Sequence, residues 1–194
     1  YAQAADQGSA RGRCNLGVCH WFGKGVEKDQ ARAVKLYAKA AEQGDARAQY
    51  NLGVCYEYGT GVEKNEACAA ELYAKAAEQG VSAAQGNLGE LYMDGLGVQQ
   101  DWAAAFQLFE SAAKDAEALS SRVWLAWLLW HGRGTEQDRP RAELLCEQVR
   151  GTERFAERLA NDYFASGEVW PAVLKWLQEM MVAPEATQAH RNTS

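Results

Sequence analysis

The sequence predicts an all-α protein, a solenoid of stacked antiparallel helix pairs. The nine residues LYAKAAEQG occur twice without change, at 36–44 and at 72–80. The first eight residues, YAQAADQG, resemble a third copy, and Tyr1 precedes Tyr37 by 36 positions. Apolar residues inside these copies follow a helical spacing, and self-similarity at one period of roughly 20 to 50 residues is typical of stacked repeats.

The first helix of each unit is marked by one of four aligned segments. They are NLGVCHWFGKGV from Asn15, NLGVCYEYGTGV from Asn51, NLGELYMDGLGV from Asn87 and WLAWLLWHGRGT from Trp124. One Leu recurs in them at 16, 52, 88 and 125, so the last step is 37 residues and the others are 36. The extra residue falls after residue 116, just before the fourth segment.

A loop with the pattern Gly-x-Gly follows each of these helices. Glycine tolerates positive φ and ends a helix at little steric cost, so the paired glycines suit a sharp reversal between antiparallel helices. A phosphate-binding loop is the alternative, but this loop follows a helix, lacks the Lys-Ser/Thr of such loops and recurs in every unit. The pairs are Gly23 and Gly25, Gly59 and Gly61, Gly95 and Gly97, and Gly132 and Gly134.

The second helix of each unit begins after a residue that can cap it. Side-chain oxygens of Asp and Asn accept the free amide hydrogens at a helix start, and the candidates are Asp29, Asn65, Asp101 and Asp138. Behind Asp29, an apolar stripe at i, i+3, i+4 and i+7 places Ala33, Leu36, Tyr37 and Ala40 on one helical face. The same stripe recurs 36 residues later.

For the second unit, the pattern predicts helices near Ala46 to Tyr58 and near Asn65 to Gln79. The whole chain is expected to contain at least ten helices and no sheet. Gly53 and Gly89 lie beside the recurrent Leu, where a missing side chain allows close contact between helices. We therefore expect that a large side chain at Gly53 over-packs the core.

The chain divides into units along this period. The predicted segments are 1–8, the end of a truncated preceding repeat; 9–44, 45–80 and 81–116, three regular repeats; 117–151, a divergent repeat; 152–183, a degenerate capping helix pair; and 184–194, a tail expected to be disordered. The divergent repeat departs from the others at four positions. With the first helix of a unit called helix A and the second helix B, Ala126 replaces the helix-A Gly, Leu129 the helix-A Tyr, Thr135 the loop Val and Cys146 the helix-B Tyr.

The combined pattern resembles the Sel1-like repeat, a relative of the tetratricopeptide repeat. The motif is Leu-Gly-x-x-Tyr-x-x-Gly-x-Gly-Val, followed by Asp-x-x-x-Ala-x-x-Leu-Tyr-x-x-Ala-Ala-x-x-Gly, and it extends from Tyr1 to about Gly151. The resemblance implies a right-handed α-α superhelix. It also implies a non-catalytic scaffold or adaptor that binds a protein or peptide.

Two other functions remain open at this level. The first is a hydrolase of the Sel1-like β-lactamase type, whose relatives keep a cysteine pair in every repeat, a feature that this chain lacks. The second is a regulatory repeat segment of a longer multidomain protein. An assay for turnover on generic hydrolase substrates separates the first from a scaffold, and the context of the full-length gene separates the second.

Charge and composition narrow the class of partner. The net charge is -6, with acidic and basic residues interspersed, which argues against nucleic-acid binding. No apolar run reaches the roughly 18 residues of a membrane span, so we expect no membrane insertion within this segment. The five cysteines are an odd number and fit free thiols in a reducing compartment such as the cytoplasm. The sequence determines neither the compartment nor the oligomeric state.

No catalytic residue, metal site or cofactor is predicted. His20 takes the place of a tyrosine in the next two repeats, so we expect a packed, hydrogen-bonded histidine. Cys14, Cys19 and His20 are close in sequence and could suggest a zinc site. On a helix, however, Cys14 lies about 140° from Cys19 and about 120° from His20, so the three side chains do not readily converge on one ion. Cys19 and Cys55 are expected to be buried and Cys68 to be exposed.

A binding surface is predicted from the geometry of the first helix of each unit. With the recurrent Leu at 0°, the offsets of -2, +2 and +5 fall near about 160°, 200° and 140°, opposite the core. In the related tetratricopeptide stacks, these offsets line a concave groove that holds peptide. They hold Cys14, Gly86 and Val123, together with the predicted partner-binding residues Val18, Trp21, Tyr50, Val54, Glu57, Glu90, Met93, Trp127 and Trp130.

This predicted stripe has aromatic and acidic character, and three of its members are tryptophans. We expect a partner segment to place apolar side chains against the aromatic residues and any basic group near Glu57 or Glu90. The alternative is that Trp127 and Trp130 are buried under the capping helices, with Trp124 completing an aromatic core.

Overall fold

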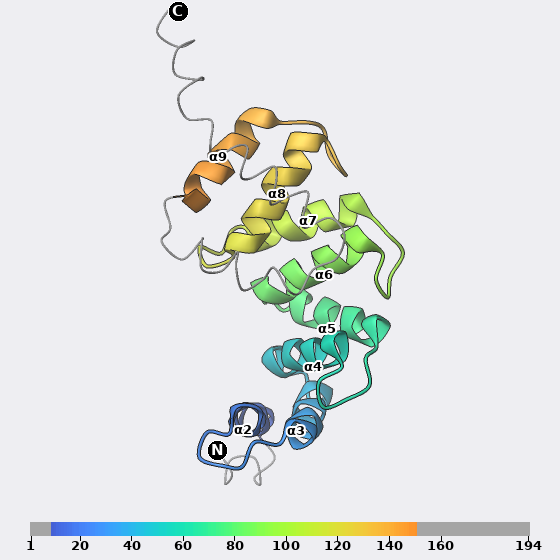
Figure 1. Cartoon of the computed structure of the whole chain (residues 1–194), viewed down its shortest axis with the longest axis vertical. Coiled ribbons are helices and arrows are strands. Elements are labelled where there is room, and N and C mark those ends of the chain that lie inside the picture. The colour runs from blue at the N-terminus through green and yellow to red at the C-terminus, as the bar shows by residue number, and fades with distance from the viewer. Residues whose placement is uncertain (1–8, 151–194) are drawn as a thin grey trace, which may run out of the picture.

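The computed structural model describes residues 9–150, which form a continuous stack of α-helices (Figure 1). In Figure 1 the helices succeed one another from α2, in blue near the N-terminus, to α9, in orange. Their bounds are α2 Ala10–Phe22, α3 Gln30–Glu42, α4 Ala46–Tyr58, α5 Glu66–Glu78, α6 Ser82–Asp94, α7 Trp102–Ala112, α8 Leu119–His131 and α9 Arg139–Arg150. No strand occurs within residues 9–150.

The helices pack as four consecutive pairs, α2 with α3, α4 with α5, α6 with α7 and α8 with α9, and each pair contacts the next. The two helices predicted for the second unit are confirmed as α4 and α5, with Asn65 as the N-cap of α5. Three predicted segments lie outside the described residues: 1–8, 152–183 and 184–194. The helices expected in addition to α2 to α9 also lie outside them. No helix in the described part of the chain is both long and apolar enough for a bilayer crossing.

The predicted caps are confirmed at the starts of all four second helices. Asp29 accepts the amide hydrogen of Arg32 at 2.8 Å, and Asn65 accepts that of Cys68 at 3.0 Å. Asp101 accepts from two amides in α7, and Asp138 accepts the amide of Arg141 at 3.0 Å. These bonds satisfy amide donors that a helix start leaves unpaired, so the sequence fixes each boundary locally.

Close packing inside each regular unit depends on a glycine opposite an aromatic ring. A Cβ built on Gly53 lies 2.7 Å from Cε1 of Tyr73, whose side chain is fully buried. The corresponding contacts are 2.6 Å from Gly17 to Tyr37 and 2.8 Å from Gly89 to Phe109. The expectation that Gly53 and Gly89 allow close helix contact is confirmed, and the partner in each case is the aromatic residue of helix B.

The fourth unit replaces both members of this pair. Ala126 stands where the other units have glycine, and Cys146 stands where they have an aromatic residue. Both belong to the core cluster of this unit, in which Ala126 is fully buried. The side chain on helix B is smaller than in the regular units, and the one on helix A is larger. The added methyl group of Ala126 therefore offsets part of the volume that is lost where Cys146 replaces an aromatic ring.

The second glycine of the second, third and fourth loops makes a contact between units. A Cβ at Gly61 lies 2.7 Å from the backbone oxygen of Gln30, at the start of the second helix of the preceding unit. The equivalent distances are 2.3 Å from Gly97 to the carbonyl carbon of Glu66 and 2.1 Å from Gly134 to the oxygen of Trp102. These glycines therefore let the loop of one unit rest directly on the previous helix pair.

The extra residue of the fourth step lies in the turn between α7 and α8. The Arg122 guanidinium donates from Nη1 to the oxygen of Ala116 at 3.2 Å and from Nη2 to that of Asp115 at 3.1 Å. Its Nε donates to the oxygen of Ala113 at 3.2 Å. One arginine therefore satisfies three carbonyls of the longer turn, and α8 begins after Ala118 without a side-chain cap.

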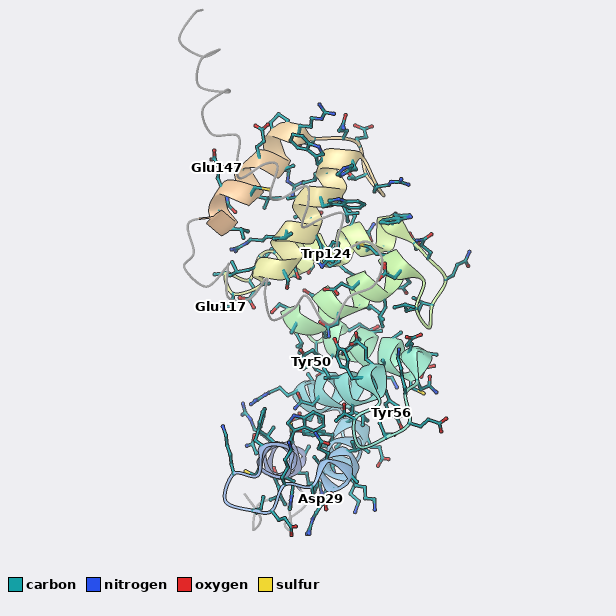
Figure 2. All side chains as sticks on the ribbon, in the orientation of Figure 1. Asp29, Tyr50, Tyr56, Glu117, Trp124 and Glu147 are labelled. Carbon is teal, nitrogen blue, oxygen red and sulfur yellow. The ribbon has the colours of Figure 1, made fainter. Side chains whose placement is uncertain are left out.

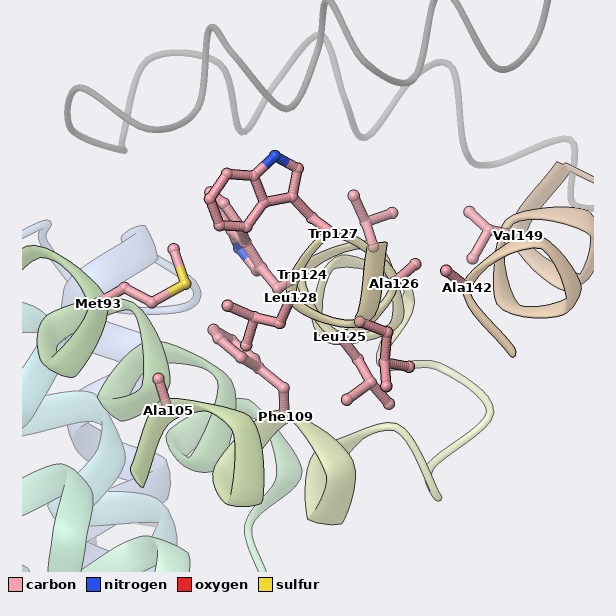
Figure 3. Close-up of a cluster of buried hydrophobic side chains, with 12 residues drawn as sticks. Met93, Ala105, Phe109, Trp124, Leu125, Ala126, Trp127, Leu128, Ala142 and Val149 are labelled. Carbon is pink, nitrogen blue, oxygen red and sulfur yellow. The ribbon is translucent and has the colours of Figure 1, made fainter. Parts of the chain in front are cut away.

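The largest apolar cluster of the described residues, the fourth-unit core cluster, joins α8 and α9 to α6 and α7 of the third unit (Figure 3). Figure 3 shows Phe109 next to Leu128, while Ala142 and Val149 face α8 from α9. Phe109 and Trp124 are stacked, with ring centroids 6.1 Å apart. Trp124 is only 2% exposed, which agrees with the expected aromatic core.

Candidate functional site

The first helices of the four units, α2, α4, α6 and α8, carry the residues predicted to bind a partner; we call this surface the helix-A face. Figure 2 shows two of its aromatic side chains, Tyr50 on α4 and Trp124 on α8. Seven of the nine predicted residues are half-buried and therefore partly open to solvent. These are Val18, Trp21, Tyr50, Val54, Glu57, Glu90 and Trp130.

The other two predicted residues are buried, in contrast to the expectation of an open stripe. Met93 is 1% exposed and Trp127 is 8% exposed, and both pack into the fourth-unit core cluster. The Trp127 ring lies 6.0 Å from that of Trp102 and 4.6 Å from the imidazole of His131. For Trp127 the structure therefore favours the core alternative.

Three of the four stripe positions at offset -2 are buried as well. Cys14 is 1% exposed, and its sulfur accepts a long hydrogen bond, 3.8 Å, from Nδ2 of Asn51 on α4. A Cβ at Gly86 lies 2.8 Å from the Ser121 hydroxyl of α8, and Val123 is buried too. Cys14 and Gly86 thus contact the helix A of the following unit instead of facing solvent; Tyr50 is the half-open exception.

Four predicted residues of the regular repeats meet around one hollow. Val18 and Trp21 of α2 and Tyr50 and Val54 of α4 line a depression of about 160 Å³. The remaining lining residues are Phe22, Tyr37, Asn51 and Cys55. Tyr37 and Cys55 are buried and form the floor, whereas Phe22 is 61% exposed at the rim.

Aromatic packing holds the walls of this hollow in place. The Trp21 ring lies 6.5 Å from that of Tyr37, and the Tyr50 ring lies 5.8 Å from that of Tyr73. Tyr37 and Tyr73 are the buried helix-B residues that pack on Gly17 and Gly53. The residues that stabilise each unit therefore also position the exposed aromatic side chains.

A carboxylate lies one helical turn beyond the hollow. Glu57 is three residues after Val54 on α4, so the two side chains are neighbours on one helix face. The Tyr73 hydroxyl donates to Oε2 of Glu57 at 2.5 Å, and Asn87 donates from Nδ2 to the Tyr73 oxygen at 3.0 Å. Tyr58, the next residue on α4, lies close enough to Glu57 for the two side chains to influence each other's pKa.

Burial raises the pKa of the Glu57 carboxyl above its ordinary value, because the charged form loses hydration. The side chains of Tyr73, Tyr58 and Asn87 and the ammonium of Lys64 oppose this shift. Lys64 forms an ion pair with Glu66 and Arg141 forms one with Glu110, and neither pair includes Glu57. The Tyr73 hydroxyl, which donates to the Glu57 carboxylate, is neutral.

The second acidic residue of the stripe, Glu90, accepts a hydrogen bond from the next unit. The indole Nε1 of Trp124 donates to Oε1 of Glu90 at 3.0 Å. Farther along the face, the Trp130 ring lies 5.1 Å from the guanidinium of Arg139. Both predicted residues thus remain on the helix-A face, but each packs against a charged or aromatic neighbour from α8 or α9.

The thiols and His20 can be placed directly. All five cysteines are free; Cys55 is buried as expected, and burial raises its pKa to about 11. The expectation that Cys19 is buried and Cys68 exposed is wrong, since both are half-buried. His20 is buried, and its Nδ1 donates to the oxygen of Glu27 at 3.2 Å, which confirms a packed histidine.

A second hollow, not predicted from the sequence, lies on the helix-B side between α5, α6 and α7. Its volume is about 370 Å³, and its lining combines small apolar residues with four polar ones. The lining residues are Ala74, Ala77, Glu78, Gln85, Leu88, Tyr92, Ala104, Gln107, Leu108 and Ser111. It is larger than the hollow on the helix-A face but lacks tryptophan, and Tyr92 is its single aromatic residue.

Metal binding requires several ligating side chains close together. Within residues 9–150, no three His, Cys, Asp or Glu side chains are grouped so that they could hold a metal ion. The arrangement on the helix-A face is instead suited to contact: an apolar hollow with aromatic walls, next to a carboxylate.

The solved structures that the chain matches share this architecture. A protective antigen of uropathogenic Escherichia coli strains with an SLR fold is 31% identical, with a TM-score of 0.74, and the match covers 94% of this chain but 40% of the antigen. A Sel1 repeat protein from Oxalobacter formigenes is also 31% identical, with a TM-score of 0.71, and the match covers 93% of this chain and 76% of that protein. This chain therefore spans less than half the length of the antigen.

A more distant structure, a putative Sel1 repeat protein from Klebsiella pneumoniae subsp. pneumoniae, is 22% identical with a TM-score of 0.64 over 97% of this chain and 94% of that one. It supports the fold alone. Among curated proteins, none matches the sequence. The Sel1 repeat model matches residues 10–45, 46–81, 82–116 and 120–148, which correspond to the four helix pairs. With four matched repeats covering well over half of its length, the chain belongs to the Sel1 repeat family.

Proposed function

We propose that this chain is a non-catalytic scaffold or adaptor that binds a segment of another protein on its helix-A face. Sel1 repeats generally mediate protein interactions, which gives the class of function. That the partner binds on the helix-A face is our own proposal. The observation that carries it is the hollow between α2 and α4, because four of its lining residues were predicted independently from repeat geometry.

The chemistry of this hollow suits recognition of a peptide. Trp21 and Tyr50 present partly exposed rings that are already held by packing against Tyr37 and Tyr73. Preorganised aromatic side chains bury a large area on binding at little cost in side-chain entropy, and Trp and Tyr are enriched among residues that dominate binding energy. The exposed Phe22 at the rim extends the apolar surface.

Affinity capture with a double variant tests the proposal. The immobilised protein is compared with the variant Trp21→Ala/Tyr50→Ala, and captured proteins are identified by mass spectrometry. The proposal predicts that specific partners disappear from the variant. A matched control, Leu96→Ala/Leu144→Ala, removes two exposed apolar side chains away from the hollow and should retain the partners.

The folded state of both variants is checked by circular dichroism, because Trp21 and Tyr50 also pack against buried rings. Val54→Lys provides a second disruption, since it introduces a charge at a half-buried wall position without removing an aromatic contact. If a correctly folded Trp21→Ala/Tyr50→Ala protein captures the same partners, the helix-A face is not the binding surface.

The proposal also predicts no turnover on generic hydrolase substrates, including β-lactams. The hydrolase alternative depends on likeness to relatives with a cysteine pair in each repeat. In this chain only Cys19 and Cys55 share a repeat position, no repeat pattern of cysteine pairs occurs, and all five cysteines are free. Turnover that persists after further purification and is lost in a folded variant would establish an enzyme instead.

A further inference from the structure

The helix-A face combines an apolar hollow with a neighbouring carboxylate, and this pairing indicates the chemistry of the segment that it binds. We propose that the segment is basic and apolar: it places an apolar side chain in the hollow and an arginine guanidinium against Glu57, beside Tyr50 and Tyr58. This inference rests on the proposed function and adds the class of partner.

The distance between the two parts of the site suits an extended peptide. Val54 lines the hollow, and Glu57 follows it by three residues on α4, which places their Cβ atoms roughly 5 to 6 Å apart. In an extended peptide, side chains two positions apart are separated by about 6.6 Å on the same face. An apolar residue and an arginine at i and i+2 therefore match the hollow and the carboxylate.

The charge of the site favours a basic partner segment. Glu57 accepts a hydrogen bond from the neutral Tyr73 hydroxyl at 2.5 Å and belongs neither to the Lys64–Glu66 nor to the Arg141–Glu110 ion pair. The whole chain carries a net charge of -6. A cation that reaches Glu57 gains a charge-assisted bond in a partly dehydrated setting, where such bonds are stronger than in open water.

The tyrosines beside Glu57 favour arginine over lysine in the partner segment. Tyr50 and Tyr58 flank the carboxylate in the sequence of α4, and both stand within interaction range of the same buried Tyr73 or of Glu57 itself. A planar guanidinium stacks on tyrosine rings while it donates two parallel hydrogen bonds to a carboxylate. Tyr58 is 49% exposed, so its ring is open to such a contact.

The test selects peptides from a random phage-displayed library on the immobilised protein. We expect the enriched sequences to share an apolar residue with an arginine two positions away. A synthetic peptide of the enriched sequence, labelled with fluorescein, is then titrated with the protein and its variants by fluorescence anisotropy.

Three variants separate the two levels of the proposal. Glu57→Gln retains an oxygen that accepts from Tyr73 but removes the charge, and it should weaken binding of the peptide about tenfold or more. Glu71→Gln, which removes an exposed carboxylate from α5, is the matched control and should change the dissociation constant less than about twofold. Trp21→Ala/Tyr50→Ala should abolish binding.

Each outcome decides one of the two claims. The claim of a basic partner is overturned if the selected peptides lack basic residues or bind Glu57→Gln as tightly as the unmodified protein. If Trp21→Ala/Tyr50→Ala still abolishes binding of those peptides, the helix-A face remains the binding surface. Peptides that bind the double variant unchanged overturn both claims. Failure of the library to yield any peptide dependent on Trp21 also counts against both.

Discussion

Gly53 offers a quantitative test of how each unit is packed. A Cβ at this position lies 2.7 Å from Cε1 and 2.8 Å from Cδ1 of Tyr73. Carbon atoms in contact prefer separations of about 3.5 to 4.0 Å, so the Tyr73 ring has to retreat by roughly 1 Å. That ring is fully buried and is tied through its hydroxyl to Glu57 and Asn87, which leaves it little room.

The expected magnitude follows from two opposing effects. Over-packing a buried site typically costs about 1 to 3 kcal/mol, whereas replacing a mid-helix glycine by alanine gains about 1 kcal/mol from helix propensity. Gly53→Ala should therefore reduce the free energy of unfolding by about 0 to 2 kcal/mol. Gly53→Leu adds three further carbon atoms at the same contact and should cost more than the alanine variant.

A double-mutant cycle isolates the steric contact from the propensity effect. Gly53→Ala is measured by urea unfolding in the unmodified protein and again in a Tyr73→Leu background, where the ring is absent. We expect Gly53→Ala to become stabilising there, with a coupling energy of about 1 to 3 kcal/mol. If the effect of Gly53→Ala is the same in both backgrounds, Tyr73 is not what requires glycine at this position.

Three other outcomes follow from the structure. Gly97→Ala should lower the free energy of unfolding by about 1 to 3 kcal/mol more than Gly80→Ala does. Both glycines have positive φ, but only a Cβ at Gly97 meets backbone atoms, the nearest 2.3 Å away. Equal losses of stability in the two variants contradict this. Because the pKa of Glu57 is raised in the folded state, the folded protein binds more protons than the unfolded chain. The stability of the protein relative to Glu57→Gln should therefore fall as pH rises above about 4.3. Parallel pH profiles of the two proteins, measured by urea unfolding, contradict this. With a thiol reagent, half-buried Cys68 should react before Cys55, which is 1% exposed and has a pKa of about 11; mass spectrometry of partly labelled protein that finds Cys55 modified first contradicts this.

Much of the architecture could be predicted because the relevant signals are local. A cap such as Asn65 and a C-terminal glycine such as Gly59 act within one helical turn, so they define helix bounds without knowledge of neighbouring units. The 36-residue period then repeats the same helix pair along the chain. For that reason the predicted bounds of α4 agree with the observed Ala46–Tyr58.

The candidate site was only partly predictable, because burial depends on how units stack. The angles around a single helix correctly place Val18 and Val54 away from the residues that face the core of their unit, and both line the hollow. It gives no information on the next unit, and so it missed the contact of Cys14 with Asn51. In the fourth unit, Trp127 packs on Trp102 instead of remaining open, a contact that the regular repeats have no residues to form.

The central claim is that a partner segment binds the helix-A face, and site-specific photo-crosslinking tests it most directly. A photoreactive amino acid is placed at Val54, in the wall of the helix-A hollow, or at Gln107, an exposed residue at the larger hollow on the helix-B side. After irradiation with the selected peptide or a captured partner, we expect a covalent adduct from position 54 and none from position 107. An adduct from position 107 alone would place the partner on the opposite side of the stack and contradict the account.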